Sequence, residues 1–201
     1  MTTEKKLTPQ DPAYWDSFHE KYDLLPGSQI GEPTLALIKL ATNGSTIKNV
    51  LDIGCGTGAL MRLMCTRFRD WKISGMDFSP EAANLVGQTT HGDSLPFFSA
   101  NMNAIPVKDN SIDLVTAFRV SPFMEPQVPG EIWRILRPGG TLFVATNSEY
   151  SRCPPNSIES INDTRGKFSD LTLVLSGRYR EASGLILNLC GFRKRLTELS
   201  T

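Results

Sequence analysis

The sequence predicts an α/β fold, in which a doubly wound and mostly parallel sheet carries helices on both faces. Short aliphatic runs alternate with segments whose apolar residues recur at helical spacing, and this alternation is typical of βαβ units. A glycine-rich turn follows the first aliphatic run, at the place where open α/β sheets bind ligands. The chain has 201 residues, of which 40% are hydrophobic, so we expect one well-buried domain.

Two helices are expected ahead of the first strand. Residues 13–22, AYWDSFHEKY, place aromatic side chains at helical spacing, and the turn LLPG at 24–27 ends that segment. The second helix has Pro33 in its first turn and ends near Asn43 and Gly44. The aromatic segment precedes the sheet, so it either folds over the ligand site as a lid or packs on the side of the domain.

Five strands are expected in the middle of the chain, each a compact run of β-branched, aliphatic or aromatic residues. They are residues 49–53, 72–76, 96–100, 112–118 and 141–146. Three helices alternate with them. One covers 59–68, a second begins at Ser79-Pro80-Glu81 with a hydroxyl N-cap, and a third ends at the RPGG turn, 137–140. The apolar face of the third helix consists of Val128, Ile132, Ile135 and Leu136.

The last third of the sequence is less regular. Residues 151–170 are polar and rich in turn formers, which predicts a long loop of the functional or mobile kind. A helix is expected next, with Gly191 as its stop signal, followed by a last strand at 193–199. The face of this helix would consist of Ala182, Leu185, Ile186 and Leu189.

The composition argues against several classes of partner. The chain has 21 basic and 21 acidic residues, so no basic excess points to a nucleic acid. The basic residues near the C-terminus alternate with glutamates and are expected to form a solvated face. They are Arg178, Arg180, Arg193, Lys194 and Arg195. The N-terminus does not read as a signal peptide, and no apolar stretch reaches the ~20 residues of a membrane span. Four cysteines without a CxxC pair and two isolated histidines give no zinc pattern, so a reduced, cytoplasmic and metal-free protein is expected.

The glycine turn lies in VLDIGCGTG, residues 50–58. Glycines let a ligand approach the bare backbone, although a tight turn without a ligand is the alternative. A dinucleotide loop reads GxGxxG and meets a pyrophosphate, whereas this turn reads GxGxG and follows Asp52. An acid at that position suits the ammonium group of S-adenosylmethionine better than a pyrophosphate. Asp77, at the end of the next strand, can accept hydrogen bonds from both ribose hydroxyls.

Four segments resemble the successive motifs of class I S-adenosylmethionine-dependent methyltransferases. They are VLDIGCGTG, GMDFSPE, NAIPVKDNSIDLV and EIWRILRPGG, in that order. The resemblance covers residues 45–147 and extends more loosely to 199. It implies a single Rossmann-like methyltransferase domain over 1–201, with 45–147 as the cofactor-binding core. Residues 1–44 would form an N-terminal helical lid, and 148–201 an acceptor-side loop, a last helix and a strand.

The resemblance also implies cofactor-binding roles along the chain. The methionine end of S-adenosylmethionine would be held by Asp52, Gly54, Cys55, Gly56 and Gly58. Asp77 would bind the ribose, and Phe118 would lie near the sulfonium. Phe78 would pack on the adenine face, while Asn101 and Met102 would contact the adenine edge. Relatives more often have an aspartate in place of Asn101, and ordinary core packing is the alternative for both phenylalanines.

The activity that the resemblance implies is methyl transfer from S-adenosylmethionine to an O or N atom of a small molecule. The alternatives are a protein or RNA methyltransferase, and a cofactor-binding partner protein without catalytic activity. No general base carries over from the family, because SPF at 121–123 stands where many relatives have a histidine. His19, Tyr22 and Arg119 are the catalytic candidates, with a structural or solvated role as the alternative for each.

The end of the sheet departs from the family pattern. Relatives finish with an antiparallel hairpin, but only one strand's length of chain follows Gly191. Either LTLVL at 171–175 supplies the other strand, or the sheet has a shortened C-terminal strand set.

Overall fold

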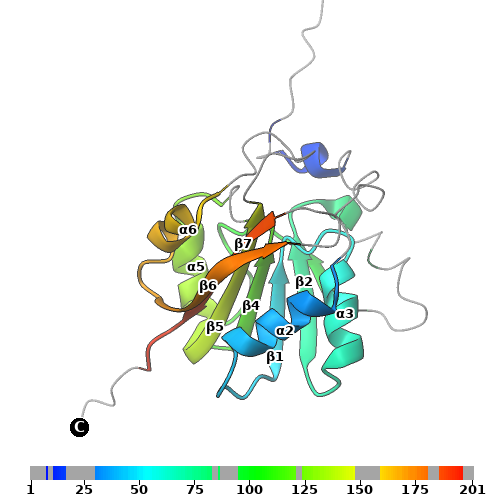
Figure 1. Cartoon of the computed structure of the whole chain (residues 1–201). Coiled ribbons are helices and arrows are strands. Elements are labelled where there is room, and N and C mark those ends of the chain that lie inside the picture. Colours follow the sequence, from blue (N-terminus) through cyan, green and yellow to red (C-terminus); the bar gives the residue numbers. More distant parts are fainter. Residues whose placement is uncertain are drawn as a thin grey trace, which may run out of the picture.

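The chain forms a twisted sheet between two layers of helices in the computed structural model (Figure 1). The structure describes residues 8, 11–16, 30–82, 86, 95–120, 124–147, 159–180 and 186–196. Within these residues the sheet has seven strands, in the order β3-β2-β1-β4-β5-β7-β6. The strands are β1 Asn49–Ile53, β2 Lys72–Asp77, β3 Phe97–Ser99, β4 Ile112–Phe118, β5 Leu136–Asn147, β6 Thr172–Arg180 and β7 Ile186–Arg193. The labelled helices are α2 Glu32–Ala41, α3 Ala59–Arg67, α5 Val128–Ile135 and α6 Ile161–Lys167.

The strand order reverses in the middle of the sheet. Strand β1 pairs in parallel with β2 on one side and with β4 on the other. The chain therefore builds outward from β1 in one direction, crosses over, and continues from β4 in the other. The β5–β7 and β7–β6 pairs are antiparallel. The predicted doubly wound, mostly parallel sheet is confirmed, and its switch point lies between β1 and β4.

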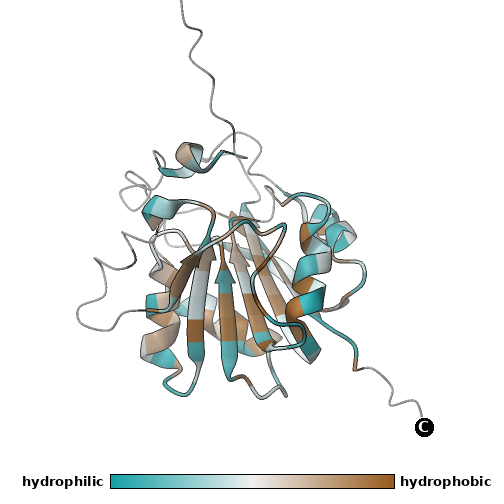
Figure 2. Cartoon of the chain, turned by 180° about the vertical axis from the view of Figure 1, so that it is seen from behind, coloured by the Kyte–Doolittle hydropathy of each residue, from teal (hydrophilic) through white to brown (hydrophobic). Residues whose placement is uncertain are grey.

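Two apolar layers hold the helices on the sheet. Helices α2 and α3 pack on one face through side chains such as Leu35, Ile38 and Met64, which are fully buried. Helices α5 and α6 cover the opposite face, where Ile132 and the ring of Phe168 are buried (Figure 1). Figure 2 shows apolar residues along the strands, as expected for a sheet that is covered on both faces.

The elements predicted for the middle of the chain are confirmed, with small changes at their ends. Strand β4 has the predicted bounds, and the side chain of Ser79 caps the helix start by accepting a hydrogen bond from the N–H of Ala82 at 3.2 Å. Strand β5 is longer than predicted. It begins at Leu136, so the RPGG segment lies within the strand and α5 ends directly before it at Ile135. The aromatic segment is helical at 12–16, and its remainder lies outside the described residues.

The C-terminal third corrects three predictions. Residues 161–167, predicted as part of a loop, form α6, whose start is fixed by a capping box between Ser160 and Asp163. The predicted helix over 182–191 is wrong at its described residues, and so is the strand predicted at 193–199, because Ile186–Arg193 is strand β7. Gly191 lies inside that strand, where a Cβ would come within 2.9 Å of the Cβ of Ala41. Ala182 and Leu185 lie outside the described residues.

The sheet ends in an antiparallel hairpin after all. The sequence left open whether residues 171–175 supply the missing strand or the sheet is one strand short, and β6 Thr172–Arg180 includes most of these residues. The shortened C-terminal set is therefore wrong. Strand β7 is buried along almost its whole length because it lies between β5 and β6. Its apolar residues occupy enough positions to match a helical spacing by coincidence.

Lys194 is the exception to the predicted solvated face. It is only 3% exposed, and its Nζ donates hydrogen bonds to the carbonyls of Trp133 and Leu136 at 2.9 and 2.8 Å. A third bond goes to Oδ1 of Asn110 at 2.8 Å, and the Nζ lies 3.8 Å from the centroid of the Trp133 ring. The carbonyls at the end of α5 attract a cation, so the amine is buried there. Arg178 is exposed as predicted.

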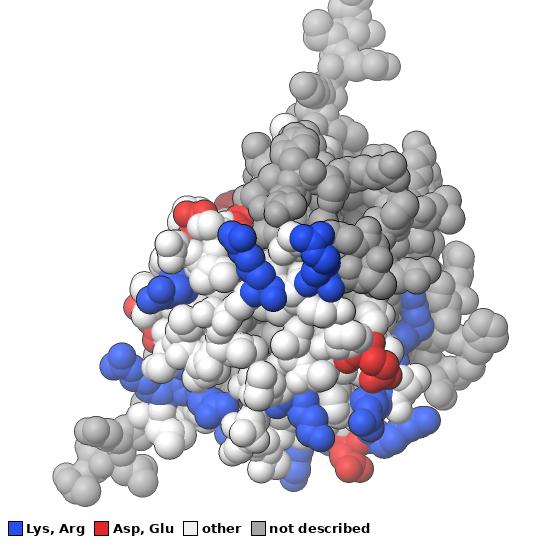
Figure 3. All heavy atoms as spheres, in the orientation of Figure 1, with Lys and Arg blue, Asp and Glu red and all other residues white. Residues whose placement is uncertain are grey.

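The surface charge is uneven although the chain is neutral overall. Figure 3 shows more Lys and Arg than Asp and Glu on this face of the described part of the chain. No helix among the described residues is long and apolar enough to cross a membrane.

Candidate functional site

The glycine turn bends around the carboxyl end of β1. The N–H groups of Gly54 and Cys55 both donate to the carbonyl of Met76, at 2.8 and 3.1 Å, which ties the turn to the end of β2. Gly54 has a φ of +65°, and a Cβ there would lie 2.7 Å from Cγ2 of Val120. Gly56 and Gly58 also have positive φ. The turn therefore has room for backbone but not for a side chain at Gly54.

Asp77 fastens the turn from the end of β2. Its Oδ2 accepts a hydrogen bond from the N–H of Gly56, and its Oδ1 accepts one from the N–H of Ser79, both at 2.9 Å. The side chain is 7% exposed. Each carboxylate oxygen has a second lone pair, so the same group that shapes the turn can also accept hydrogen bonds from a ligand.

The side chain of Asp52, directly before the glycine turn, is buried. It is 2% exposed, and its Oδ1 accepts a hydrogen bond from Oγ1 of Thr116 at 2.6 Å. Burial raises the pKa of Asp52 to about 7, and the charge of Asp77 adds to the shift, while the Thr116 hydrogen bond opposes it. A cationic group bound beside Asp52 would favour its ionised form. The charge of Asp52 is thus poorly compensated by the described residues around it.

The Cys55 side chain belongs to the core, although its backbone belongs to the turn. A Cβ built on Gly75 would lie 2.8 Å from the Cys55 Sγ, on the side of the sheet where α3 packs. Burial, followed by the charges of Asp52 and Asp77, raises the pKa of the Cys55 thiol. The thiol is therefore a packed and unreactive group.

The turn after β4 lies next to the glycine turn. Phe118 is half-buried against the core cluster that includes α2 and α3, and the guanidinium of Arg119 lies 5.1 Å from the centroid of its ring. Arg119 has a φ of +64°, which is unusual for a residue with a side chain. Its N–H donates to the carbonyl of Ala145 at 2.6 Å. Val120 then closes over Gly54, so the ends of β1, β4 and β5 meet at this turn.

The comparisons with known proteins agree with this geometry. Residues 51–144 match a family model described as a methyltransferase domain. The chain is 31% identical, over 131 residues, to a malonyl-[acyl-carrier protein] O-methyltransferase from Hahella chejuensis. Residues 51–144 are therefore a methyltransferase domain of the class I S-adenosylmethionine-dependent superfamily. S-adenosylmethionine is the cofactor of this superfamily.

Two further similarities show how far the match extends. A demethylmenaquinone methyltransferase from Thermus thermophilus is 33% identical over 101 residues, which are 48% of this chain and 46% of the relative. The Hahella match covers 62% of this chain and 45% of the relative, so the chain spans about half the length of the curated relatives it matches. The structure of an S-adenosylmethionine-dependent methyltransferase from Aquifex aeolicus aligns with a TM-score of 0.66 at 16% identity. That alignment covers 90% of this chain and 98% of the other, and it shows a shared fold.

The residues predicted to bind the methyltransferase cofactor gather at one edge of the sheet. All of them lie in turns at the carboxyl ends of β1, β2, β3 and β4 or at the last residues of these strands. Phe78 is half-buried directly after Asp77. Asn101 is exposed after β3, and its Oδ1 accepts a hydrogen bond from the N–H of Asn103 at 2.8 Å, while Met102 packs on the core. The arrangement fits a ligand with an ammonium group at one end and a ribose in the middle, because Asp52 and Asp77 face the same turn.

Other candidates fall outside this cluster. His19 and Tyr22 lie outside the described residues. Among the described residues no group of three or more His, Cys, Asp or Glu side chains is placed to hold a metal ion. Arg119 is the catalytic candidate that the structure places at the carboxyl edge.

Two residues of the site escaped prediction from the sequence. Thr116 is a buried hydroxyl in an otherwise apolar strand, and this contrast was a usable signal for a partner such as Asp52. Asp16 gives no such signal. Its Oδ1 accepts a hydrogen bond from Oγ of Ser79 at 2.5 Å and lies 3.4 Å from the N–H of Glu81. The N-terminal segment therefore touches the helix start directly beyond Asp77.

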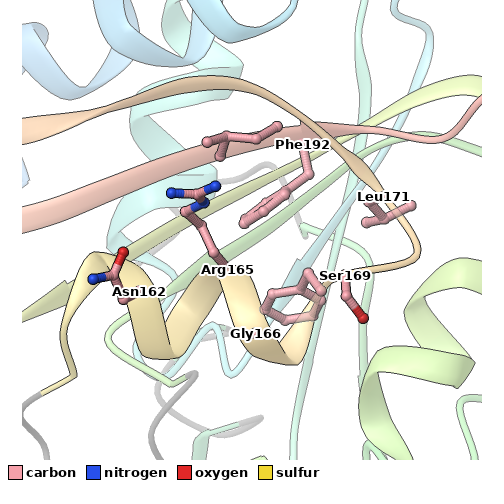
Figure 4. Close-up of a pocket in the computed structure, with 8 residues that line it drawn as sticks. Asn162, Arg165, Gly166, Ser169, Leu171 and Phe192 are labelled. Atoms are coloured by element: carbon pink, nitrogen blue, oxygen red, sulfur yellow. The ribbon is translucent and has the colours of Figure 1, made fainter.

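A separate hollow of about 560 Å³ lies between α6 and strands β6 and β7. Figure 4 shows Arg165 reaching from α6 toward the strands, beside the ring of Phe192, with Asn162 and Ser169 at the rim. None of its lining residues belongs to the glycine turn or to the turns after β2 and β4. This hollow is therefore distinct from the candidate cofactor site.

Proposed function

We propose that the chain is an S-adenosylmethionine-dependent methyltransferase that transfers a methyl group to an O or N atom of a small-molecule acceptor. The observation that carries the proposal is the pair of buried carboxylates, Asp52 and Asp77, on either side of a glycine turn at the switch point of the sheet. The names of the similar proteins support a small-molecule acceptor, since they include demethylmenaquinone and sterol methyltransferases, and one of them is an O-methyltransferase.

The chain's own residues would position the cofactor rather than activate it. When bound, S-adenosylmethionine supplies an electrophilic methyl group for an in-line displacement, so geometry is the main catalytic requirement. Asp52 would hold the ammonium end, and its pKa would fall as the cation approached. Asp77 would fix the ribose while keeping the turn closed through Gly56 and Ser79. Phe118 would exclude water from the side of the sulfonium.

Radiolabelled S-adenosylmethionine tests this proposal against its alternatives. The protein is incubated with labelled cofactor and a fractionated lysate, and Asp77→Ala serves as the negative control. Label in small molecules is the expected result. Label in protein or RNA would favour a macromolecular acceptor. Cofactor binding without any transfer would favour a non-catalytic partner protein, and absence of cofactor binding would contradict all three functions.

We also propose that the N-terminal segment is an acceptor-side lid, with residues 45–147 as the cofactor core. The contact between Asp16 and Ser79 supports this, because it places the segment beside the carboxyl edge of the sheet. A variant lacking residues 1–26 should fold and bind S-adenosylhomocysteine within several-fold of the full chain, yet lose methyl transfer. Asp16→Ala should weaken transfer, whereas Asp11→Ala, which removes hydrogen bonds with Thr8, should weaken it less. Unfolding of the truncated protein would instead make the segment a core element.

A further inference from the structure

Arg119 has an unusual backbone for a residue that is neither glycine nor asparagine. Its φ is +64°, and Asn110 is the other non-glycine residue with positive φ in the described part of the chain. Asparagine tolerates the left-handed region because its short side chain bonds locally, whereas arginine is not among the residues that favour this region. Strained residues of this kind gather at functional sites, where the surrounding structure holds them in place.

The neighbours of Arg119 fix it at the switch point of the sheet. Its N–H donates to the carbonyl of Ala145 at the end of β5, and the next residue, Val120, faces the open side of Gly54 on the glycine turn. The guanidinium lies 5.1 Å from the ring centroid of Phe118, and its Nε is buried. The conformation therefore brings a cation to the centre of the carboxyl edge.

The charges at this edge divide by strand. The carboxylates of Asp52 and Asp77 come from β1 and β2, on the side that the proposed function gives to the cofactor. The cation comes from the end of β4. At the end of β5, Thr146 and Asn147 bond to the backbone of Glu159, whose buried carboxylate pairs with Lys167 of α6. Arg119 thus follows the strand beside β1, on the side away from β2, so it belongs to the acceptor side of the proposed cofactor site.

We propose that Arg119 is an acceptor-binding residue and that the acceptor is a carboxylate, which the enzyme converts to a methyl ester. The inference rests on the proposed methyltransferase function and names its substrate class. A guanidinium offers two parallel N–H donors that match the two oxygens of a carboxylate. The substrate would be a small organic acid, with one oxygen held by Arg119 and the other directed at the methyl group.

The chemistry needs no proton transfer. The carboxylate oxygen attacks the methyl carbon, the new O–CH₃ bond forms as the S–CH₃ bond breaks, and the electron pair of that bond stays on sulfur. The products are a neutral ester and the thioether S-adenosylhomocysteine. Because a carboxylic acid is already ionised at neutral pH, this acceptor needs no general base. An amine or an alcohol would have to lose a proton.

The test compares acids with matched alcohols and amines. The probes are straight-chain carboxylates from acetate to decanoate, benzoate and phenylacetate, with the alcohol and amine of the same carbon skeleton. Binding is measured by calorimetry on protein saturated with S-adenosylhomocysteine. Transfer is measured with labelled S-adenosylmethionine, and ester product is recognised because mild alkali releases its label as methanol. We expect the acids alone to bind and to give alkali-labile product.

Variants of Arg119 then assign the effect. Arg119→Gln should lower kcat/KM for the best acid by about 10- to 100-fold, since a charge-assisted pair of hydrogen bonds is lost, and should leave S-adenosylhomocysteine binding within about threefold. Arg119→Lys should retain part of the activity, and the exposed control Arg69→Gln should retain all of it. Arg119→Gly should raise the unfolding temperature while losing acid methylation, because glycine relieves the backbone and removes the cation.

Several results would overturn the proposal. They are methylation of alcohols or amines in preference to acids, an equal loss of cofactor binding in Arg119→Gln, full activity of that variant, and a wild-type protein that binds S-adenosylhomocysteine but none of the acids. If the wild-type protein bound no S-adenosylhomocysteine, the proposed function itself would fail, which is a different result.

Discussion

A buried aspartate lies at each end of the sheet, and the pKa values of the two are shifted in opposite directions. At the amino end, Oδ2 of Asp113 accepts hydrogen bonds from the N–H groups of Lys48 and Asn49 at 3.0 and 2.7 Å, and Arg137 contacts Oδ1. Burial alone would raise the pKa of Asp113, but the Asn49 and Lys48 N–H groups and the Arg137 charge outweigh it and lower the pKa. At the carboxyl end, burial prevails and raises the pKa of Asp52 to about 7.

The difference separates a structural carboxylate from the one that the proposed function assigns to the ammonium group of the cofactor. The charge of Asp113 is compensated within the fold, so it joins β4 to the segment before β1 and stabilises the native state. The charge of Asp52 meets one hydroxyl and the repulsion of Asp77. The fold accepts an unfavourable charge there, which a bound cation would compensate.

Asp52→Asn should produce the largest effect. The pKa of Asp52 is higher in the folded state than the unfolded value of 3.8, so the contribution of this residue to wild-type stability is greatest below pH 3.8 and is lost as the pH rises from there through about 7. Asparagine removes this loss. The variant should be more stable than wild type by as much as about 4 kcal/mol above pH 7, with a much smaller difference near pH 4.

Urea unfolding of both proteins between pH 4 and pH 8 measures this difference. The same variant should bind S-adenosylmethionine more weakly. A pH-independent difference in stability would contradict the assignment of an uncompensated charge to Asp52.

Asp113→Ala should shift stability in the opposite direction, by about 2–3 kcal/mol at pH 7, because two backbone N–H groups and Arg137 lose their acceptor. The loss should shrink in acid, since a lowered pKa gives stability that is present above the unfolded pKa and disappears as the pH falls through the folded one. Asp109→Ala, which breaks a more exposed ion pair with Arg134, should cost under about 1 kcal/mol. Chemical denaturation measures the stability of both variants. Similar losses of stability in Asp113→Ala and Asp109→Ala would contradict the special role of Asp113.

Asp77→Ala should weaken cofactor binding more than the loss of the Asp52 charge does. The reason is that Asp77 carries a charge and also holds the glycine turn. We expect S-adenosylhomocysteine affinity to fall by about 1.5–3 kcal/mol in calorimetry, as hydrogen bonds to a charged acceptor are lost. Asp70→Ala, at an exposed position after α3, is the control. Unchanged affinity in Asp77→Ala would show that the ribose lies elsewhere.

Asn101→Asp should give the smallest effect, a gain in cofactor affinity on the order of 1 kcal/mol, because a carboxylate accepts from the adenine amino group more strongly than an amide. Its existing hydrogen bond with the N–H of Asn103 can be kept. A competition assay with S-adenosylhomocysteine is sensitive enough to detect this change. Weaker binding would mean that the Asn101 side chain acts as a donor or points away from adenine.

The sequence was most informative where a buried run has clear boundaries. Strand β4 was predicted residue for residue because charged and turn-forming neighbours flank IDLVTAF. The acids that we predict to bind the cofactor were singled out by their places in such runs, since Asp52 interrupts the first aliphatic run and Asp77 follows the second. Strand β7 was missed for the opposite reason, since a strand buried on both faces has no alternation, and Ile186 and Leu189 also fit one face of a helix.

Tertiary contacts explain the other errors. Lys194 has a charged side chain, which is typical of the surface. Its burial is favourable because its Nζ donates hydrogen bonds to the carbonyl of Trp133, at the C-terminal end of α5, and to Oδ1 of Asn110. Helix α6 is short, and its Ser160–Asp163 capping box was present in the sequence but lay among turn-forming residues. Asp16 is far from Ser79 along the chain, so no local pattern could have joined them.

The late position of β7 has a consequence for synthesis of the protein. Strand β5 pairs with β4 on one side, but its other edge pairs with β7, which is made only after β6. A nascent chain that has reached Asn147 would therefore expose an apolar edge until residues 186–193 leave the ribosome. Pairings between segments so distant along the chain form slowly, and open strand edges favour aggregation. Insertion of β7 between β5 and β6 would then be the last step that closes the sheet, and Lys194 would secure it on α5.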